Sequence, residues 1–257
     1  MTRSATVEDV VEGRARWCVV VATDCLDVIR ALPAESLDAI VTDPPYASTG
    51  DSSSIVSTHG VGLVPVEVQF YEAWAREHLR EWVRALRPTG AAWFTCDWRG
   101  AMVFDLSAHK IGVRRPCVGV WDREGLGMGN ILRHVWEAFV ILPCPLFQRR
   151  KTDEPDLWRH RWTIGERSGE HSAEKPVALF RRAVELVTSP GELVLDPFAG
   201  SGTTGVAALE AGRRVVLIER DADYAEIARR RCEAATAGVG VDWRTPEQRS
   251  LFQAEGP

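Results

Sequence analysis

Two short segments of the sequence each place chemically useful residue types directly after a predicted buried strand. In the first, the apolar run 37–42 is followed by Asp43-Pro44-Pro45-Tyr46. Two adjacent prolines fix φ and remove two amide donors, which leaves the backbone carbonyls free as acceptors. Such a corner suits an exocyclic aromatic amine. Asp43 and the Pro44 carbonyl would accept both N–H groups and favour a tetrahedral nitrogen, while Tyr46 would stack on the base. An ordinary turn is the alternative.

The second segment is a glycine-rich loop between a short predicted strand, 193–196, and a predicted helix, 203–211. Its residues Gly200-Ser201-Gly202-Thr203-Thr204-Gly205 fit G-x-G-x-x-G, and Glu219 stands 19 residues after Gly200 at a strand end, where an acidic group can hold ribose hydroxyls. A nicotinamide or flavin cofactor is therefore one interpretation. Against it, Asp196-Pro197-Phe198-Ala199 separates the strand from the first glycine, and the carboxylate of Asp196 would repel a pyrophosphate.

S-adenosylmethionine fits this loop better, because its sulfonium and ammonium groups are cationic and it carries no phosphate. Its ribose suits Glu219, and its adenine could stack on Phe198. The remaining alternative is structural: Asp196 and Pro197 would only end a strand, and the glycines would only open a helix.

Predicted strands and helices alternate along the chain, which is typical of a doubly wound α/β fold with a mostly parallel sheet covered on both faces. Residues 17–236 are expected to form this domain. The stretches 1–16 and 237–257 are expected to be flexible, and 144–170 is expected to be an insertion outside the core, because it lacks apolar periodicity. The expected strands are 17–22, 37–42, 91–96, 117–121, 138–142, 193–196 and 214–218, and the expected helices are 26–32, 67–86, 174–188, 203–211 and 223–235.

Composition excludes several classes of protein. The chain has 257 residues, 45% of them hydrophobic and 26% charged, with a net charge of −5, which excludes a fibrous or disordered chain and a generally basic coat. No run approaches the ~18 apolar residues of a membrane span, and the N-terminus has no signal-peptide core, so a cytoplasmic protein is expected. The six cysteines include no C-x-x-C pair, so neither a metal site nor a disulfide framework is predicted.

With both motifs in view, the chain resembles the amino-methylating DNA methyltransferases, the N6-adenine and N4-cytosine enzymes, in the permuted order that puts the catalytic motif before the cofactor motif. The resemblance covers roughly residues 19–231. It rests on Asp24-Cys25-Leu26, Ser36 to Tyr46, Trp121-Asp122-Arg123 with Gly127-Met128-Gly129, Glu174-Lys175-Pro176, and Asp196 to Thr204. It implies the S-adenosylmethionine-dependent methyltransferase fold and methyl transfer to adenine N6 of a base flipped out of double-stranded DNA. Asp43 favours adenine over cytosine, since the cytosine enzymes more often have Ser there.

The resemblance also assigns site residues. It implies that Asp24 and Cys25 line the adenine of the cofactor and that His171 and Lys175 approach its methionine end. Simpler alternatives are a helix cap for Asp24 and a solvated cation for Lys175. The family's basic residue after the strand 138–142 is absent here, where Cys144 and Pro145 follow. The full expected set comprises Asp43, Pro44, Pro45 and Tyr46 for catalysis, and Asp24, Cys25, His171, Lys175, Asp196, Pro197, Phe198, Ala199, Gly200, Ser201, Gly202, Thr203 and Glu219 for the cofactor.

An enzyme of this kind must extrude its target base from the duplex and grip the flanking phosphates. We expect the insertion 144–170 to do this through its basic residues. The alternative is a solvated loop whose two tryptophans pack on the domain. Its small size favours a short recognition sequence, help from the loop 47–65, or a homodimer. The expected DNA-binding residues are Arg149, Arg150, Lys151, Arg159 and Arg161, flanked by Trp158 and Trp162.

The C-terminal tail contains Gln248-Arg249-Ser250-Leu251-Phe252. This pentapeptide resembles the Gln-x-x-Leu-Phe peptides that dock into bacterial replication sliding clamps, in which Gln248 would supply hydrogen bonds and Leu251 and Phe252 the apolar anchor. Packing of the Leu-Phe pair on the domain itself is the alternative, because an exposed apolar pair is unfavourable unless something buries it.

Overall fold

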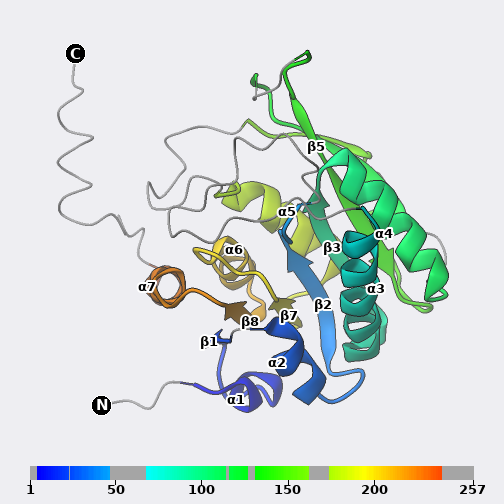
Figure 1. Ribbon diagram of the computed structural model, residues 1–257. Helices are drawn as coiled ribbons and strands as arrows, with labels where there is room; N and C mark the ends of the chain where they lie inside the picture. The colour runs from blue at the N-terminus through cyan, green and yellow to red at the C-terminus, as the bar shows by residue number, and fades with distance from the viewer. Residues whose placement is uncertain are drawn as a thin grey trace, which may run out of the picture.

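The computed structural model describes residues 5–22, 24–46, 68–113, 116–126, 131–161 and 174–238. They form one eight-stranded sheet in the order β1-β8-β7-β2-β3-β5-β4-β6 (Figure 1). Only β5 runs antiparallel to its neighbours. The strands are β1 Trp17–Val21, β2 Leu37–Thr42, β3 Leu86–Cys96, β4 Cys117–Asp122, β5 Trp136–Pro143, β6 Leu157–Arg159, β7 Leu193–Asp196 and β8 Arg214–Glu219. The helices are α1 Val7–Val11, α2 Cys25–Ala31, α3 Val68–Ala85, α4 Trp98–Lys110, α5 Val177–Val187, α6 Thr203–Glu210 and α7 Ala222–Ala237.

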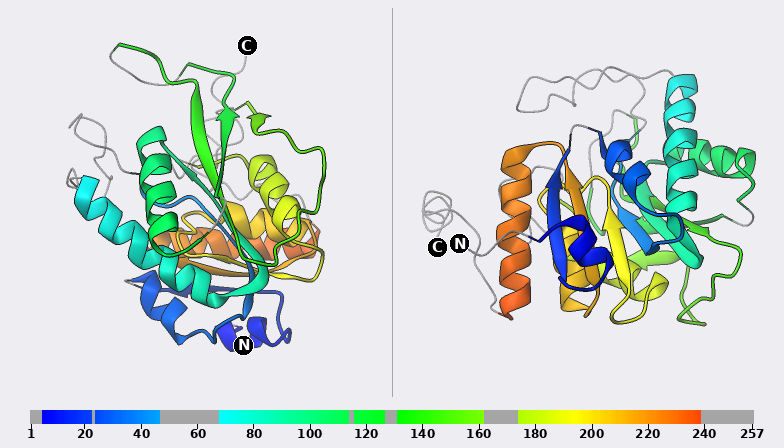
Figure 2. Two further views of the ribbon diagram at one scale, coloured as in Figure 1. Left: turned by 90° about the vertical axis from the view of Figure 1, so that its right-hand side faces the viewer. Right: turned by 90° about the horizontal axis from the view of Figure 1, so that it is seen from below.

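Each face of the sheet has its own hydrophobic core. Helices α1 to α4 pack on one face around Ile29, Leu79 and Phe104, and α5 to α7 pack on the other around Phe180 and neighbouring residues (Figures 1 and 2). The central strand β2 is buried at all six positions, because helices cover both of its faces. The expected doubly wound α/β fold with a mostly parallel sheet is therefore confirmed.

The register between β2 and β7 brings the two motifs together. These strands are parallel neighbours, with Ala39 opposite Val194 and Ile40 opposite Leu195. Their last residues are joined by a hydrogen bond in which the Thr42 hydroxyl donates to Asp196 Oδ1 over 2.6 Å. The chain after β2 and the chain after β7 thus leave the same edge of the sheet side by side. This is the edge where ligands bind in open α/β sheets.

The start of the chain differs from the expectation. Residues 1–16 were expected to be flexible, but α1 packs on the domain, and Val10 is fully buried. A capping box between Thr6 and Asp9 begins the helix, and Arg214 donates to the carbonyls of Val10 and Val11. The prediction is wrong for residues 5–16, because a short capped helix with a single buried residue gives little periodic signal.

The insertion 144–170 also contributes to the core, contrary to the prediction. Its residues 157–159 form β6, which pairs with β4 at the edge of the sheet. Trp158 is fully buried, stacks on Trp93 with ring centroids 5.9 Å apart, and has the Arg182 guanidinium 4.5 Å from its ring.

Among the described residues, no helix has both the length and the apolar character that crossing a membrane requires.

Candidate active site

The Asp-Pro-Pro-Tyr corner is held in one conformation by its neighbours. Asp43, whose side chain is 26% exposed, accepts hydrogen bonds at both carboxylate oxygens: from the Thr95 hydroxyl at Oδ1 and from Lys175 Nζ at Oδ2, the latter over 2.8 Å. Pro44 is buried, and the Tyr71 hydroxyl donates to the Pro45 carbonyl over 2.8 Å. The donors on both oxygens therefore fix the orientation of the carboxylate.

Tyr46 lies against the same ion pair. Its hydroxyl donates to Glu137 Oε2 over 2.5 Å, and Lys175 Nζ lies 4.9 Å from its ring centroid. Burial, together with the nearby carboxylates of Asp43 and Glu137, raises the pKa of Tyr46 well above its usual value. The phenol therefore stays protonated and continues to donate to Glu137, which fixes the position of the ring.

Lys175 is a buried cation between two carboxylates. Its side chain is 7% exposed, and Nζ lies 2.8 Å from Asp43 Oδ2 and 3.6 Å from Glu137 Oε2. Burial disfavours the charge, but the two carboxylates outweigh it and raise the pKa of the ammonium. Arg123 Nη1 lies 3.1 Å from the other oxygen of Glu137, so two cations balance two anions. Lys175 is therefore buried and paired, and the alternative of a solvated cation at this position is wrong.

Sequence reasoning did not assign Glu137, Thr95 or Arg123 to the site, although Arg123 stands in one of the motifs that carry the family resemblance. Thr95 lies near the carboxyl end of β3, and Arg123 directly follows β4, so knowledge of the strand order would have placed both at the catalytic edge. Glu137 lies near the amino end of β5 and reaches the same edge only because this strand is antiparallel. Position along the chain alone does not indicate that reversal.

The glycine-rich loop is held by Asp196 and Glu219 and fits closely against α7. Asp196 Oδ1 accepts from the Phe198 amide over 3.0 Å, and Oδ2 accepts from the Thr204 hydroxyl. Glu219 accepts from the Gly200 amide over 2.7 Å. It also accepts from the amides of the two residues that follow Glu219 itself, Arg220 and Asp221. Gly202 has a φ of +86°, and a Cβ there would lie 2.8 Å from the Cβ of Ala228, so only glycine fits.

A buried ion pair ties this loop to the Lys175 segment. Arg231 Nη1 lies 2.7 Å from Glu174 Oε1, and the same nitrogen donates to the carbonyl and hydroxyl oxygens of Ser201, each over 2.9 Å. Because a buried charge without its partner is costly, this contact fixes the loop relative to Lys175. The two segments that precede α5 and α6 therefore form one unit.

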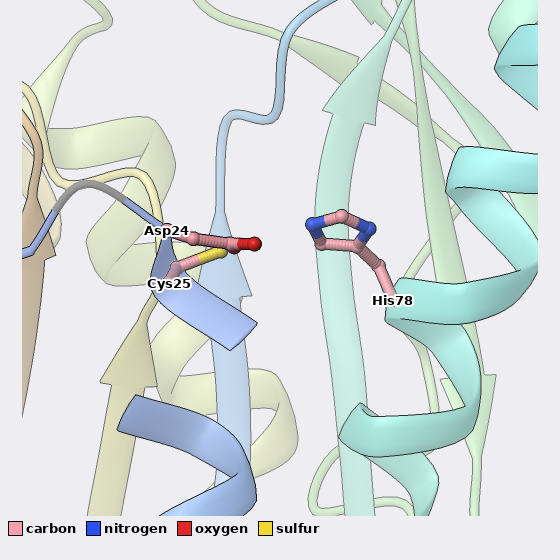
Figure 3. Close-up of side chains that lie close together, drawn as sticks. All are labelled: Asp24, Cys25 and His78. Carbon is pink, nitrogen blue, oxygen red and sulfur yellow. The ribbon is translucent and has the colours of Figure 1, made fainter. Parts of the chain in front are cut away.

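Asp24, Cys25 and His78 form a small cluster beside the loop (Figure 3). Asp24 caps α2 by accepting from the Leu26 amide over 2.9 Å, as the simpler alternative for this residue had it. The potential ligand atoms of the three side chains lie within 4.8 Å of one another. Burial, with a smaller contribution from Asp24, raises the pKa of the Cys25 thiol to about 12. His78 also lies near the glycine-rich loop, because its ring centroid is 5.8 Å from that of Phe198.

The expected DNA-binding residues do not form one patch. Arg159 and Arg161 are exposed at or just beyond the end of β6, at the catalytic edge. Arg149, Arg150 and Lys151 follow β5 at the opposite edge, where Arg150 lies 3.4 Å from Glu192 and Lys151 lies 3.6 Å from Glu185. Trp158 is buried in the core and cannot contact a base. The two basic groups of the segment 144–170 therefore lie at opposite edges of the sheet. His171, Trp162, the loop 47–65 and the tail residues Gln248, Leu251 and Phe252 lie outside the described residues.

The pKa of Asp196 makes the stability of the loop depend on pH. Burial raises this pKa from 3.8 to about 7, against the hydrogen bonds from Thr204 and Thr42 that lower it. The folded protein therefore keeps a proton that the unfolded chain loses near pH 4. The resulting stability is full below that pH and is lost as the pH rises through about 7.

We predict that the free energy of unfolding of the wild type, relative to Asp196→Asn, falls by about 3 kcal/mol between pH 5 and pH 8. Urea unfolding at a series of pH values measures this difference. Asp27→Asn, at an exposed position in α2, is the matched control. A pH-independent difference for Asp196→Asn would contradict the assignment.

Comparison with known proteins adds to this geometry. Residues 134–230 match the family model of N6/N4 DNA methylases. The type II methyltransferase M2.DpnII of Streptococcus pneumoniae is 26% identical over 247 residues, which span 84% of this chain and 90% of that protein. The DNA adenine methyltransferase YhdJ of Escherichia coli strain K12 is 24% identical over 248 residues, which span 83% and 82%.

Solved structures share the fold. The cytosine-N4-specific PvuII DNA methyltransferase superposes with a TM-score of 0.68 at 16% identity and covers 84% of this chain and 86% of that chain. TTHA0409 of Thermus thermophilus, a protein described as a DNA modification methylase and solved in complex with S-adenosyl-L-methionine, superposes with a TM-score of 0.63 at 22% identity, with coverage of 87% and 97%.

These matches agree with the two motifs and with their position at one edge of the sheet. Together they support the predicted resemblance to the amino-methylating DNA methyltransferases, and the solved structures show that the chain has the fold expected from its sequence.

Proposed function

We propose that the protein transfers a methyl group from S-adenosylmethionine to N6 of an adenine extruded from double-stranded DNA. The observation that carries this proposal is the Thr42–Asp196 hydrogen bond, which sets the amine-binding corner beside the glycine-rich loop at one sheet edge. Asp43 at the start of the corner favours adenine, as does the likeness to a protein named as a DNA adenine methyltransferase.

The corner would bind the amine by accepting both of its N–H groups, one at Asp43 and one at the Pro44 carbonyl. Each carboxylate oxygen has two lone pairs, so Asp43 can accept the amine while Thr95 and Lys175 still donate to it. These two donors hold the carboxylate in place. Hydrogen bonds from the amine to such acceptors favour a tetrahedral nitrogen, whose lone pair is available for attack. The ring of Tyr46, fixed by Glu137, would stack on the base.

The loop residues suit a cofactor with a ribose and no phosphate. Glu219 is anchored by three backbone amides and keeps one lone pair, on Oε2, for a ribose hydroxyl. Asp24 and Cys25 would line the adenine beside Phe198, and Lys175, with His171, would face the methionine carboxylate. Asp196, Pro197, Ala199, Gly200, Ser201, Gly202 and Thr203 would form the floor of this site, with Asp196 acting by holding the loop. When bound, S-adenosylmethionine supplies an activated methyl group on its sulfonium.

N4-cytosine methylation is the alternative within the family, and the likeness to a cytosine-N4-specific enzyme favours keeping it. The exocyclic amine of cytosine has the same two N–H donors, so the corner alone does not separate the two bases.

The nicotinamide-dependent oxidoreductase suggested by G-x-G-x-x-G is set aside, because the chain matches the DNA methylase family instead. Arg159 and Arg161 would contact DNA phosphates at the catalytic edge. We propose that the enzyme acts on DNA in the cytoplasm.

Two substitutions should separate the amine site from the cofactor site. Asp43→Ala should abolish transfer of labelled methyl groups to DNA and leave the affinity for S-adenosylhomocysteine within several-fold, because Asp43 acts on the amine. Glu219→Ala should instead weaken that affinity by about 1–3 kcal/mol, because it loses charge-assisted bonds to ribose. Calorimetry measures the affinity for S-adenosylhomocysteine, and a filter-binding assay measures the transfer of labelled methyl groups to DNA. Loss of both properties in Asp43→Ala, or an unchanged affinity in Glu219→Ala, would break these assignments.

We also propose two protein partners. An exposed apolar stripe on α4, formed by Trp98, Met102 and Leu106, supports a homodimer. The tail residues Gln248, Leu251 and Phe252 support docking to a replication sliding clamp, which would raise the local concentration of the enzyme on newly made DNA.

The tail proposal has a direct test. The wild type should recover purified sliding clamp in a pull-down, whereas Leu251→Ala/Phe252→Ala should not, because the variant lacks the apolar anchor. Equal recovery by both proteins, or none by either, would remove the idea. A lower melting temperature of the variant would instead support packing of the tail on the domain.

A further inference from the structure

Three large aliphatic side chains are exposed next to the catalytic edge. Leu126 is 71% exposed, Ile131 is 95% exposed and Leu132 is 76% exposed. They belong to the connection from β4 to β5, on either side of residues 127–130. The green segments that continue from these strands extend beyond the helices in Figure 2. Neighbouring exposed aliphatic side chains, such as Ile131 and Leu132, are typical of a binding surface.

The connection is rigidly tied to the catalytic corner. The Arg123 amide donates to the Val135 carbonyl over 2.9 Å, and Arg123 Nη2 donates to the His134 carbonyl over 2.6 Å. Arg123 Nη1 also contacts Glu137, which accepts from the Tyr46 hydroxyl. Arg123 and Glu137 thus link the segment that carries Ile131 and Leu132 to the ring of Tyr46, which is proposed to stack on the target base.

Charge at this edge fits a polyanion. The Arg159 side chain, 70% exposed, stands at the end of β6 beside the end of β4, and Arg161 is exposed just beyond it. Duplex DNA must cover this edge if its base is to reach Asp43. The aliphatic side chains would then face the bases, and the arginines would face the phosphates.

An extruded base leaves a gap in the stack, and proteins that open or kink DNA often fill such a gap with Leu, Ile or similar apolar side chains. We propose that Ile131 and Leu132 form a wedge that enters the duplex at the target site and occupies the space left by the extruded base. This inference rests on the proposed function, because it takes DNA base methylation as given. The apolar stripe on α4, also exposed, belongs to a helix that begins after β3 and leads away from this edge.

The test compares Ile131→Ala/Leu132→Ala with a matched control, Val118→Ala/Leu146→Ala, whose side chains are exposed at the opposite edge of the sheet. The target sequence is first mapped by sequencing DNA treated with the wild type. Methylation rates are then measured on a fully paired duplex and on the same duplex with the target base mispaired. On paired DNA, we expect the wedge variant to lose about tenfold or more in kcat/KM, because it no longer stabilises the opened stack. On mispaired DNA, where extrusion is already easy, the loss should shrink to about twofold.

The control variant should match the wild type on both duplexes, and all three proteins should bind S-adenosylhomocysteine equally. Equal activity of the wedge variant and the wild type on paired DNA would overturn the inference. The same loss on both duplexes would also overturn it, because it would indicate a general grip on DNA. Absence of any methylation by the wild type would instead overturn the proposed function itself, together with this inference.

Discussion

The pairing of β2 with β7 is the constraint on which the rest of the site depends. Because these strands are parallel neighbours, the residues that follow them must leave the same edge of the sheet. The hydrogen bond from Thr42 to Asp196 fixes the last residue of one strand against the last residue of the other. An amine held at Asp43 and a cofactor held by the glycine-rich loop are thereby brought side by side, although 153 positions separate Asp43 from Asp196 in the sequence.

Balanced charge is the second requirement at this edge. Asp43 and Glu137 would repel each other if they were alone, and Lys175 and Arg123 neutralise them. Lys175 also couples the two halves of the site, because it contacts Asp43 while its own segment is tied through Glu174 and Arg231 to the glycine-rich loop.

The sequence predicted the motifs better than their surroundings. Asp43 and Gly200 to Thr203 stand in local patterns whose chemistry and conformation can be inferred residue by residue. Glu137 could not be found in this way, because its position depends on the reversed direction of β5. Helix α4 was missed because Trp98, Met102 and Leu106 give its outer face apolar residues, which blurs the helical period. The basic residues 149–151 and 159–161 were grouped by nearness in sequence, but the chain crosses from one edge of the sheet to the other between them.

The most direct measurement of the central claim is mass spectrometry of nucleosides from unmethylated DNA treated with the purified protein and S-adenosylmethionine carrying a deuterated methyl group. The account predicts N6-methyladenine that carries the label. Labelled N4-methylcytosine without N6-methyladenine would contradict the choice of base, and the absence of any labelled nucleoside would contradict methyl transfer at this edge.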